Sequence, residues 1–135
     1  MDHAARAVAI VHAFIGGAGT LAGTLTQIAS IATEAAGGEM AGLTITTDLG
    51  RPKTVVYTDR MVPEIDQAQY SAGRGPCLEA SRQCRELMIA DVSTDERWPE
   101  FSEAALRHGV KSTLSIPLIV GGRSIGALNI YATDP

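Results

Sequence analysis

Cys77 is the residue whose type and position could support chemistry most directly. It follows Gly75 and Pro76, and proline is favoured in the first turn of a helix. A thiol in that turn meets free backbone amides and the positive end of the helix dipole, and Arg74 adds positive charge, so the thiolate is favoured. The same residue could instead be a small buried hydrophobe that packs a short helix. The sequence therefore predicts either a thiol more reactive than Cys84 or a purely structural one.

The two cysteines do not form a recognisable disulfide or metal pair. Cys84 follows Cys77 by seven residues, which on one continuous helix separates them by roughly 10 Å, too far for a disulfide. This spacing is not typical of zinc ligands. No pattern supplies a nucleophile, its base and an orienting group together, so the sequence predicts no catalytic residue and no metal site.

A hairpin near the C-terminus organises the elements around this segment. Apolar and β-branched residues over 112–132 flank the glycine pair 121–122, which is typical of a tight antiparallel turn. A two-residue loop would place Leu118 opposite Ile125. On this register one face carries Leu114, Ile116, Leu118, Val120, Ile125 and Ala127, and the other carries Thr113, Ser115, Pro117, Leu128 and Ile130. Both faces are largely apolar, so we expect the hairpin to lie in the middle of a sheet. Gly126 indicates a bulge or a close backbone approach.

Helices are predicted where apolar residues recur at helical spacing. The expected helices cover 2–15, about 20–36, about 63–70, about 76–83 and about 99–108. The second contains a heptad seam of Leu21, Leu25, Ile28, Ala32 and Ala35. We expect this seam to pack on the domain's own sheet; alternatively the first helix, or both, form a bundle between two copies. The last helix should turn Phe101, Ala105 and Leu106 inward and end at Gly109.

The remaining strands complete a mixed fold. A second hairpin is predicted from 43–47 and 54–58, with Thr44 and Thr46 on a wetter face, and a short buried strand from 87–90. Asn129, in the middle of a strand, should find a hydrogen-bond partner. The order of elements predicts an α+β fold with an antiparallel sheet and helices on its faces.

Composition limits the class of protein. At 135 residues the chain should be one domain at 20–135, preceded by a helix and a Gly-rich break at 1–19. The net charge is -4 and no cluster of Lys or Arg occurs, so we expect no direct binding of nucleic acid. Two cysteines, no basic segment before the Ala-rich start and no long apolar run predict a cytoplasmic protein without a leader or membrane span.

Several short motifs together resemble the GAF domain. They are Gln69-Tyr70, Gly75-Pro76-Cys77-Leu78-Glu79-Ala80, Asp95-Glu96-Arg97-Trp98-Pro99-Glu100-Phe101, Gly109-Val110-Lys111-Ser112, Leu114-Ser115-Ile116-Pro117-Leu118 and Gly126-Ala127-Leu128-Asn129-Ile130-Tyr131-Ala132. The combination is most similar to the GAF domains of actinobacterial regulators that carry a C-terminal RNA-binding ANTAR module. Two departures are visible: the 135 residues contain no such output module, and Arg74 stands where family members often carry an acidic residue.

The resemblance implies a GAF (PAS-like) fold with about five to six strands in the order 2-1-5-4-3, helices on both faces, and a pocket between the sheet and the helices of residues 59–86. The candidate ligand-binding residues are Gln69, Tyr70, Arg74, Cys77, Trp98 and Ser115. We expect the Gly73–Cys77 loop and the Trp98 segment to frame this pocket, on the side opposite the long N-terminal helix. Trp98 could equally anchor its helix against the sheet, and Asp66, Gln67 and Gln69 could face either the pocket or solvent.

Known branches of the family fit less well. One branch reduces free methionine sulfoxide with a cysteine in the segment before the penultimate strand, but residues 91–111 contain none. The Asn-Lys-x-Phe-Asp-Glu signature of cyclic-nucleotide GAF domains is absent. A haem ligand is not favoured either, because His108 sits at a predicted helix end, where a capping role suits a cation.

These observations predict a non-catalytic sensory or regulatory module that binds an unidentified small molecule, with its cofactor, if any, unknown. The alternatives are a redox switch or methionine-sulfoxide-reductase-like enzyme using Cys77, and a structural GAF module without a ligand. The first helix would present Val8, Val11, Phe14 and Ile15 as an apolar stripe, so we expect a homodimer whose interface includes the N-terminal helices.

Overall fold

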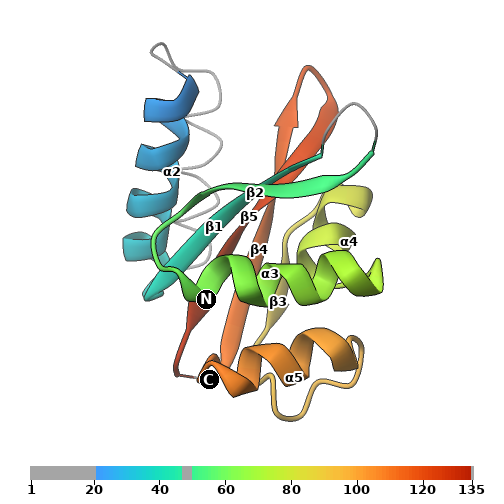
Figure 1. Ribbon diagram of the computed structural model, residues 1–135. Helices are drawn as coiled ribbons and strands as arrows, with labels where there is room; N and C mark the ends of the chain where they lie inside the picture. The colour runs from blue at the N-terminus through green and yellow to red at the C-terminus, as the bar shows by residue number, and fades with distance from the viewer. Residues whose placement is uncertain (1–20, 47–49, 135) are drawn as a thin grey trace.

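The computed structural model describes residues 21–46 and 50–134 (Figure 1). Within these residues the helices are α2 (Leu21–Ala36), α3 (Met61–Ala72), α4 (Pro76–Gln83) and α5 (Pro99–Arg107). The strands are β1 (Met40–Thr46), β2 (Pro52–Tyr57), β3 (Leu87–Ile89), β4 (Ser112–Val120) and β5 (Arg123–Ala132). The predicted helix at 2–15 and the break that follows it lie outside the described residues.

The strands form one antiparallel sheet in the order β2-β1-β5-β4-β3. This confirms the expected α+β class and strand order. The last strand lies beside the first, so β5 is central and contacts both β1 and β4. Residues from opposite ends of the chain therefore meet in the middle of the sheet.

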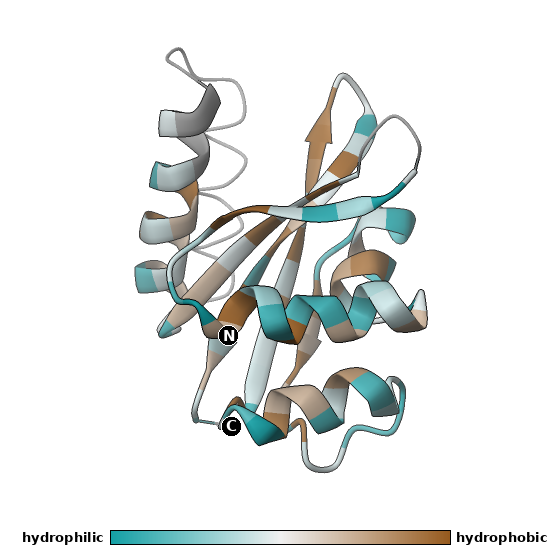
Figure 2. Cartoon of the chain, viewed as in Figure 1, coloured by the Kyte–Doolittle hydropathy of each residue, from teal (hydrophilic) through white to brown (hydrophobic). Residues whose placement is uncertain are grey.

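Two layers of helices enclose the sheet, one on each face (Figure 1). Helix α2 covers one face, where Ile28, Ala29 and Ala32 pack into an apolar cluster with strand residues. Helices α3, α4 and α5 cover the other face, around a second cluster that includes Phe101 and Tyr131. The described part of the α2 seam thus packs on the domain's own sheet, as expected. Figure 2 shows hydrophilic and hydrophobic residues alternating along α3, the pattern of a helix with one buried side.

Local signals set most helix ends where they were predicted. Pro76 and Pro99 open α4 and α5. Gly73 closes α3 with φ of 70°, and Gly109, with φ of 79°, follows α5. One inward residue was predicted wrongly: Leu106 is exposed, because the nine-residue α5 buries a narrower stripe that includes Phe101.

The central hairpin has the predicted glycine turn but a different register. Val120 pairs with Arg123 across Gly121 and Gly122, and then the register shifts between Leu118 and Ile119. Leu118 therefore faces Gly126 rather than Ile125, Ile116 faces Leu128, and Leu114 faces Ile130. The predicted faces of β5 are wrong, because a slip of one residue moves every side chain of a strand to the opposite face. Leu128 and Ile130 share the α2 side with Leu114, Ile116 and Leu118.

The wetter face expected on β1 is present only at Thr46, which is exposed at the end of the strand. Thr44 is 2% exposed and turns toward α3, where its hydroxyl bonds to Tyr70. At Thr44 the alternation of apolar and polar residues in β1 therefore reflects a polar interior instead of solvent. That interior is the basis of the candidate site.

Candidate functional site

A set of connected polar side chains, most of them buried and Thr54 and Tyr70 half-buried, lies between the sheet and helices α3 and α4. We call it the Asp66 cluster, and its members are Thr44, Thr54, Asp66, Gln69, Tyr70, Cys77, Ser115, Asn129 and Tyr131. Its members come from β1, β2, α3, α4, β4 and β5, so only the assembled sheet and helices bring them together. Polar groups at this depth are normally hydrogen-bonded to one another.

Asp66 is the centre of the cluster and is fully buried. Its Oδ1 accepts hydrogen bonds from the Tyr131 hydroxyl and from Asn129 Nδ2, the latter at 3.3 Å. Its Oδ2 accepts one from Thr54 Oγ1 at 2.7 Å. Gly42 leaves room for Val62 and for this carboxylate, because a Cβ there would overlap Val62 Cγ1 and lie 3.2 Å from Oδ2. All three donors are neutral, so the carboxylate is solvated by the protein but not neutralised.

Burial raises the pKa of Asp66 from 3.8 to about 6, because removal from water penalises the charged form more than the bonds from Tyr131, Thr54 and Asn129 favour it. The pKa values of the neighbouring acidic groups are raised as well. Burial and the nearby Asp66 carboxylate also raise the pKa of Tyr131 well above its usual range. Asp66 is therefore the group of this cluster that changes charge near physiological pH.

Cys77 lies in the first turn of α4, as predicted, but its environment is the opposite of an activating one. The residue is 1% exposed. Burial, followed by the charge of Asp66, raises the pKa of the thiol to about 12, although Thr44 and Asn129 bond to it. The expected help from Arg74 is absent, since that guanidinium pairs with Glu100 at the surface. The prediction of a reactive thiolate at the helix start is therefore wrong, and the alternative of a small buried side chain describes Cys77.

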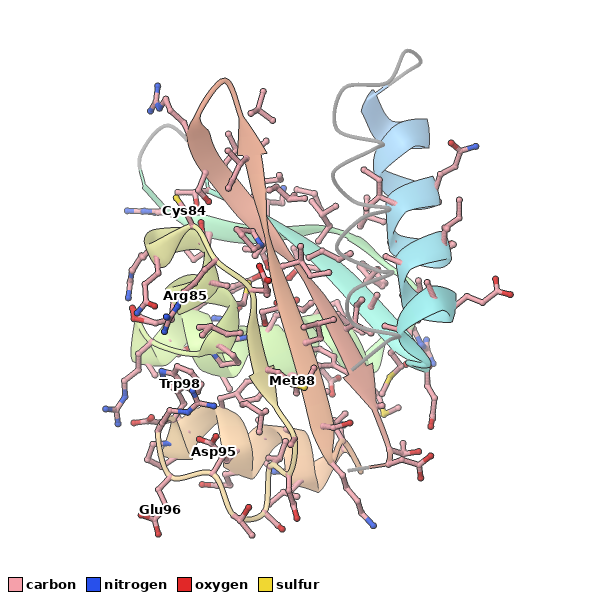
Figure 3. The ribbon with its side chains drawn as sticks, turned by 180° about the vertical axis from the view of Figure 1, so that it is seen from behind. Cys84, Arg85, Met88, Asp95, Glu96 and Trp98 are labelled. Carbon is pink, nitrogen blue, oxygen red and sulfur yellow. The ribbon has the colours of Figure 1, made fainter. Side chains whose placement is uncertain are left out.

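This burial reverses the expected order of cysteine reactivity. Cys84 is exposed and lies just past the end of α4 (Figure 3). We expect iodoacetamide to modify Cys84 in the folded protein at pH 7.5 and to modify Cys77 only after unfolding, because alkylation needs an accessible thiolate. Mass spectrometry of peptides after timed labelling measures both rates. Labelling of Cys77 as fast as that of Cys84 in the folded chain would contradict the structure.

An open cavity adjoins the Asp66 cluster at the end of the sheet that carries the β4–β5 turn. Its volume is about 440 Å³. It is lined by Thr46, Gly50, Pro52, Tyr70, Gly73, Leu78, Ser81, Arg82 and Ser124. Arg82 Nη2 donates to the Gly73 carbonyl at 3.1 Å, and the hydroxyls of Ser81 and Ser124 lie 2.8 Å apart. The lining therefore combines apolar surface with hydroxyls and one guanidinium, as small-molecule sites often do.

Tyr70 connects the cavity to the buried cluster. It lines the cavity, and its hydroxyl lies 2.6 Å from Thr44 Oγ1 and 2.7 Å from Thr54 Oγ1. Thr54 in turn donates to Asp66. A single threonine hydroxyl thus separates the phenol of a cavity-lining residue from the buried carboxylate.

Comparison with known proteins places this architecture in a family. The family model of the GAF domain matches residues 18–135. This chain belongs to the GAF domain family. No curated protein matches the sequence.

Solved structures share the GAF fold at low sequence identity. A domain from Sinorhizobium meliloti, described as part of a two-component sensor histidine kinase, has a TM-score of 0.67 at 15% identity, covering 87% of this chain and 76% of that one. A free methionine-R-sulfoxide reductase from Neisseria meningitidis, solved with its substrate, has a TM-score of 0.67 at 18% identity, with coverage of 99% and 77%. The GAF domain of the cyanobacteriochrome TePixJ has a TM-score of 0.69 at 14% identity, with coverage of 90% and 78%.

The six candidate residues of this GAF domain fall into two groups. Tyr70 lines the cavity, while Gln69, Cys77 and Ser115 belong to the adjoining cluster. Gln69 Oε1 accepts from the Cys77 backbone N–H at 2.9 Å. Ser115 Oγ donates to Asn129 Oδ1 at 3.1 Å, which gives Asn129 the partner that its position required.

Arg74 and Trp98 lie apart from the cavity. Arg74 makes a bidentate pair with Glu100 at 2.9 and 3.1 Å, which ties the loop before α4 to the first turn of α5. Trp98 is 8% exposed and packs in the apolar cluster under α5, with the Arg97 guanidinium 4.6 Å above its ring. Both segments lie on the face opposite α2, but the prediction that both frame the cavity is wrong for Trp98, which is not among the cavity-lining residues. Of the two roles predicted for Trp98, its contacts fit the one in which it anchors its helix against the sheet.

The sequence left the central residue of the cluster undecided. Asp66 could have faced either solvent or the pocket, and Thr44 and Thr54 indicated only strand. The signal that would have found them is the tyrosine pair, because Tyr70 and Tyr131 both need hydroxyl partners when buried. Among the described residues no group of three or more His, Cys, Asp or Glu could hold a metal ion. His108 ends α5 beside Glu64, with 3.2 Å between Nε2 and Oε2.

Proposed function

We propose that this GAF domain is a non-catalytic sensory module that binds a small molecule in the cavity beside Tyr70. The observation that supports this most is the junction of an open cavity of about 440 Å³ with a buried cluster built around a carboxylate. Clefts that combine apolar lining with a few placed polar groups and a perturbed pKa are typical of ligand sites. The sensory role is in keeping with the histidine-kinase domain among the structural relatives.

The alternative of a cysteine enzyme or redox switch has less support. The reductases among the structural relatives share the fold, but the Cys77 thiol is buried and holds its proton to a pKa of about 12. A nucleophilic cysteine needs an accessible, stabilised thiolate. A structural module without ligand is the other candidate, and the extensive hydrogen bonding within the Asp66 cluster is its best argument.

Detection of a bound ligand is the decisive test of this proposal. We expect native mass spectrometry of the protein purified from its host to show a retained small molecule. A Ser81→Phe variant, which places a ring in the cavity, should lose that mass. A Ser71→Phe variant places the same ring on the exposed side of α3, outside the cavity lining, and should retain it. Failure to retain any mass would favour the structural module, and equal retention by both variants would show that the ligand binds outside this cavity.

The regulatory setting is proposed from the sequence motifs. Their similarity to actinobacterial GAF–ANTAR regulators suggests a cytoplasmic regulator of gene expression whose GAF domain contacts neither nucleic acid nor membrane itself. The charge pattern agrees, since the net charge is -4 without a basic cluster. None of the described helices is long and apolar enough to cross a bilayer.

We expect a homodimer whose interface includes the N-terminal helices. Four apolar residues, Val8, Val11, Phe14 and Ile15, share one face of the predicted first helix. Covering each of them is worth roughly 1.5–3 kcal/mol. Removal of residues 1–16 should therefore convert the dimer to a monomer, as measured by light scattering. Val11→Asp should weaken the dimer, whereas Ala9→Asp, on the opposite side of the predicted helix, should not. A truncated protein of unchanged mass would show that the dimer forms elsewhere.

A further inference from the structure

Asp66 combines complete burial with the absence of a cationic partner. None of the ion pairs in the described part of the chain involves this carboxylate. Its three hydrogen bonds come from two hydroxyls and one amide. A buried charge normally has a counter-charge, because hydrogen bonds from neutral donors recover only part of the lost hydration.

The charge persists at neutral pH, since the pKa of Asp66 is about 6. The other titratable groups that face it cannot compensate. They are Tyr70 on α3, Cys77 on α4 and Tyr131 on β5, and the pKa of each is raised, so all three are neutral between pH 5 and 8. The cluster therefore carries one net negative charge.

A route from solvent to this charge exists through Tyr70. Its ring lines the cavity, and its exposed fraction is intermediate. Among the residues that the structure describes, its hydroxyl is bonded to Thr44 and Thr54. Rotation of this side chain would join the cavity to Thr54 and to Asp66 beyond it, and a ligand donor could replace the hydroxyl.

A second polar group of the cluster, the side-chain amide of Gln69, lacks a hydrogen-bond acceptor among the described residues. Gln69 is completely buried one turn after Asp66, and its Oε1 accepts from the Cys77 N–H. Its Nε2 has no hydrogen-bond partner in the described part of the chain. A buried amide donor without an acceptor is costly, and it would suit a carbonyl or hydroxyl oxygen on a ligand.

We infer that Asp66 is the recognition group for a small organic cation, such as a primary ammonium compound, that enters from the cavity past Tyr70. This inference rests on the proposed ligand-binding function and specifies the class of ligand. The ammonium would donate to Asp66 in place of the Thr54 hydroxyl and supply the missing counter-charge. A hydrogen-bond acceptor on the same ligand would meet Gln69 Nε2.

A matched pair of probes tests the charge requirement. Benzylammonium and benzyl alcohol have similar shapes but differ in charge, and each is titrated into the full ¹⁵N-labelled chain at pH 7.5. The readouts are the backbone signals of Tyr70 and Thr54 and the side-chain amide of Asn129. We expect the Kd of the ammonium to be about tenfold lower than that of the alcohol, because charge-assisted hydrogen bonds are the stronger ones.

Variants and pH identify the group responsible. The preference for the ammonium should disappear in Asp66→Asn and persist in Glu34→Gln, which removes an exposed carboxylate from α2 on the other face. In the wild-type chain the affinity for the ammonium should fall about tenfold per pH unit below pH 6 while that for the alcohol stays level, because a carboxyl must be ionised to attract a cation. This arm needs no variant to fold.

The outcomes distinguish a pocket that does not select cations from the absence of a pocket. Equal affinity of both probes at Tyr70, or an unchanged preference in Asp66→Asn, would overturn the cation assignment while leaving a ligand pocket in place. If neither probe shifts the signals of Tyr70 and Thr54, the cation assignment is overturned and the pocket itself is refuted for ligands of this size.

Discussion

Replacement of Asp66 by Asn is expected to stabilise the folded protein at pH 7 by up to about 3 kcal/mol. Folding raises the pKa of this carboxyl from 3.8 to about 6, and each pKa unit corresponds to about 1.4 kcal/mol. The sign follows from proton binding. Between these two values the folded state binds more protons than the unfolded state, so the contribution of Asp66 to stability decreases as pH rises from about 4 to about 6.

The amide can satisfy the same partners. Its oxygen would accept from Tyr131 and Asn129 as Oδ1 does, and its NH₂ would donate to Thr54, whose hydroxyl can turn toward Tyr70. The substitution therefore removes a buried charge while Tyr131, Asn129 and Thr54 all stay hydrogen-bonded, and replacement of a buried charge by a neutral group of the same shape is often stabilising. The second hydrogen of the NH₂ group gains no partner from this set, so about 3 kcal/mol is an upper value.

Urea unfolding of both proteins at several pH values from 4 to 8 measures this effect. The difference in free energy of unfolding between Asp66→Asn and wild type should grow across this range and level off above pH 7. Glu34→Gln, which removes an exposed carboxylate from α2, should give no such trend. Parallel curves for Asp66→Asn and wild type would show that the carboxyl is not desolvated as the structure has it.

A stabilised Asp66→Asn variant would also bear on function. A residue that costs stability in the free protein is expected where selection acts on binding instead of folding. If the same variant is more stable and has lost its preference for the ammonium probe, then the Asp66 carboxylate both lowers the stability of the free protein and recognises the ligand.

Gly126→Ala is expected to destabilise the protein by about 3 kcal/mol or more. Gly126 lies on the central strand β5, opposite Ile45 on β1 and Leu118 on β4. A Cβ at this position would overlap the carbonyl oxygen of Thr44 and lie 2.8 Å from its carbon and 3.0 Å from Ile45 Cα. These are backbone atoms of a neighbouring strand, so no side chain can move aside to make room.

Gly121→Asn provides the matched control. Gly121 lies in the β4–β5 turn with φ of 59°, and a Cβ there would meet nothing within 4 Å. Asparagine tolerates this backbone region in tight turns, so stability should change by no more than about 0.5 kcal/mol. Thermal unfolding of both variants distinguishes the two positions. A mild effect of Gly126→Ala would mean that β1 and β5 do not approach each other this closely.

Much of the fold was predictable because its signals are local. The glycine pair 121–122 specifies the turn of the central hairpin, and Pro76 and Pro99 specify the starts of two helices, because each acts through its own backbone. The motif around Gln69 and Tyr70 and the other short motifs indicated the family, and with it the strand order. The turn and the two helix starts do not depend on where the rest of the chain lies, whereas the strand order was implied only by the family resemblance.

The register of the central hairpin and the candidate site depended on contacts between distant residues. The shift after Leu118 accompanies the close approach of Gly126 to Thr44 on another strand, so turn length alone gave the wrong faces of β5. Asp66 meets Tyr131 only because β5 inserts beside β1.

Cys77 shows the same division between local and distant causes. Its place at a helix start was readable from Pro76, and by itself it favours a thiolate. Its burial depends on the packing of α4 over the sheet, and the desolvation that follows raises the pKa of the thiol and outweighs the helix dipole. Within the described residues, sequence by itself determined which elements form and where α4 and α5 start, while β1, β2 and α3 each begin two or three residues earlier than predicted. The tertiary structure decided which polar side chains lost their water, and therefore which carboxylate was left without a counter-charge.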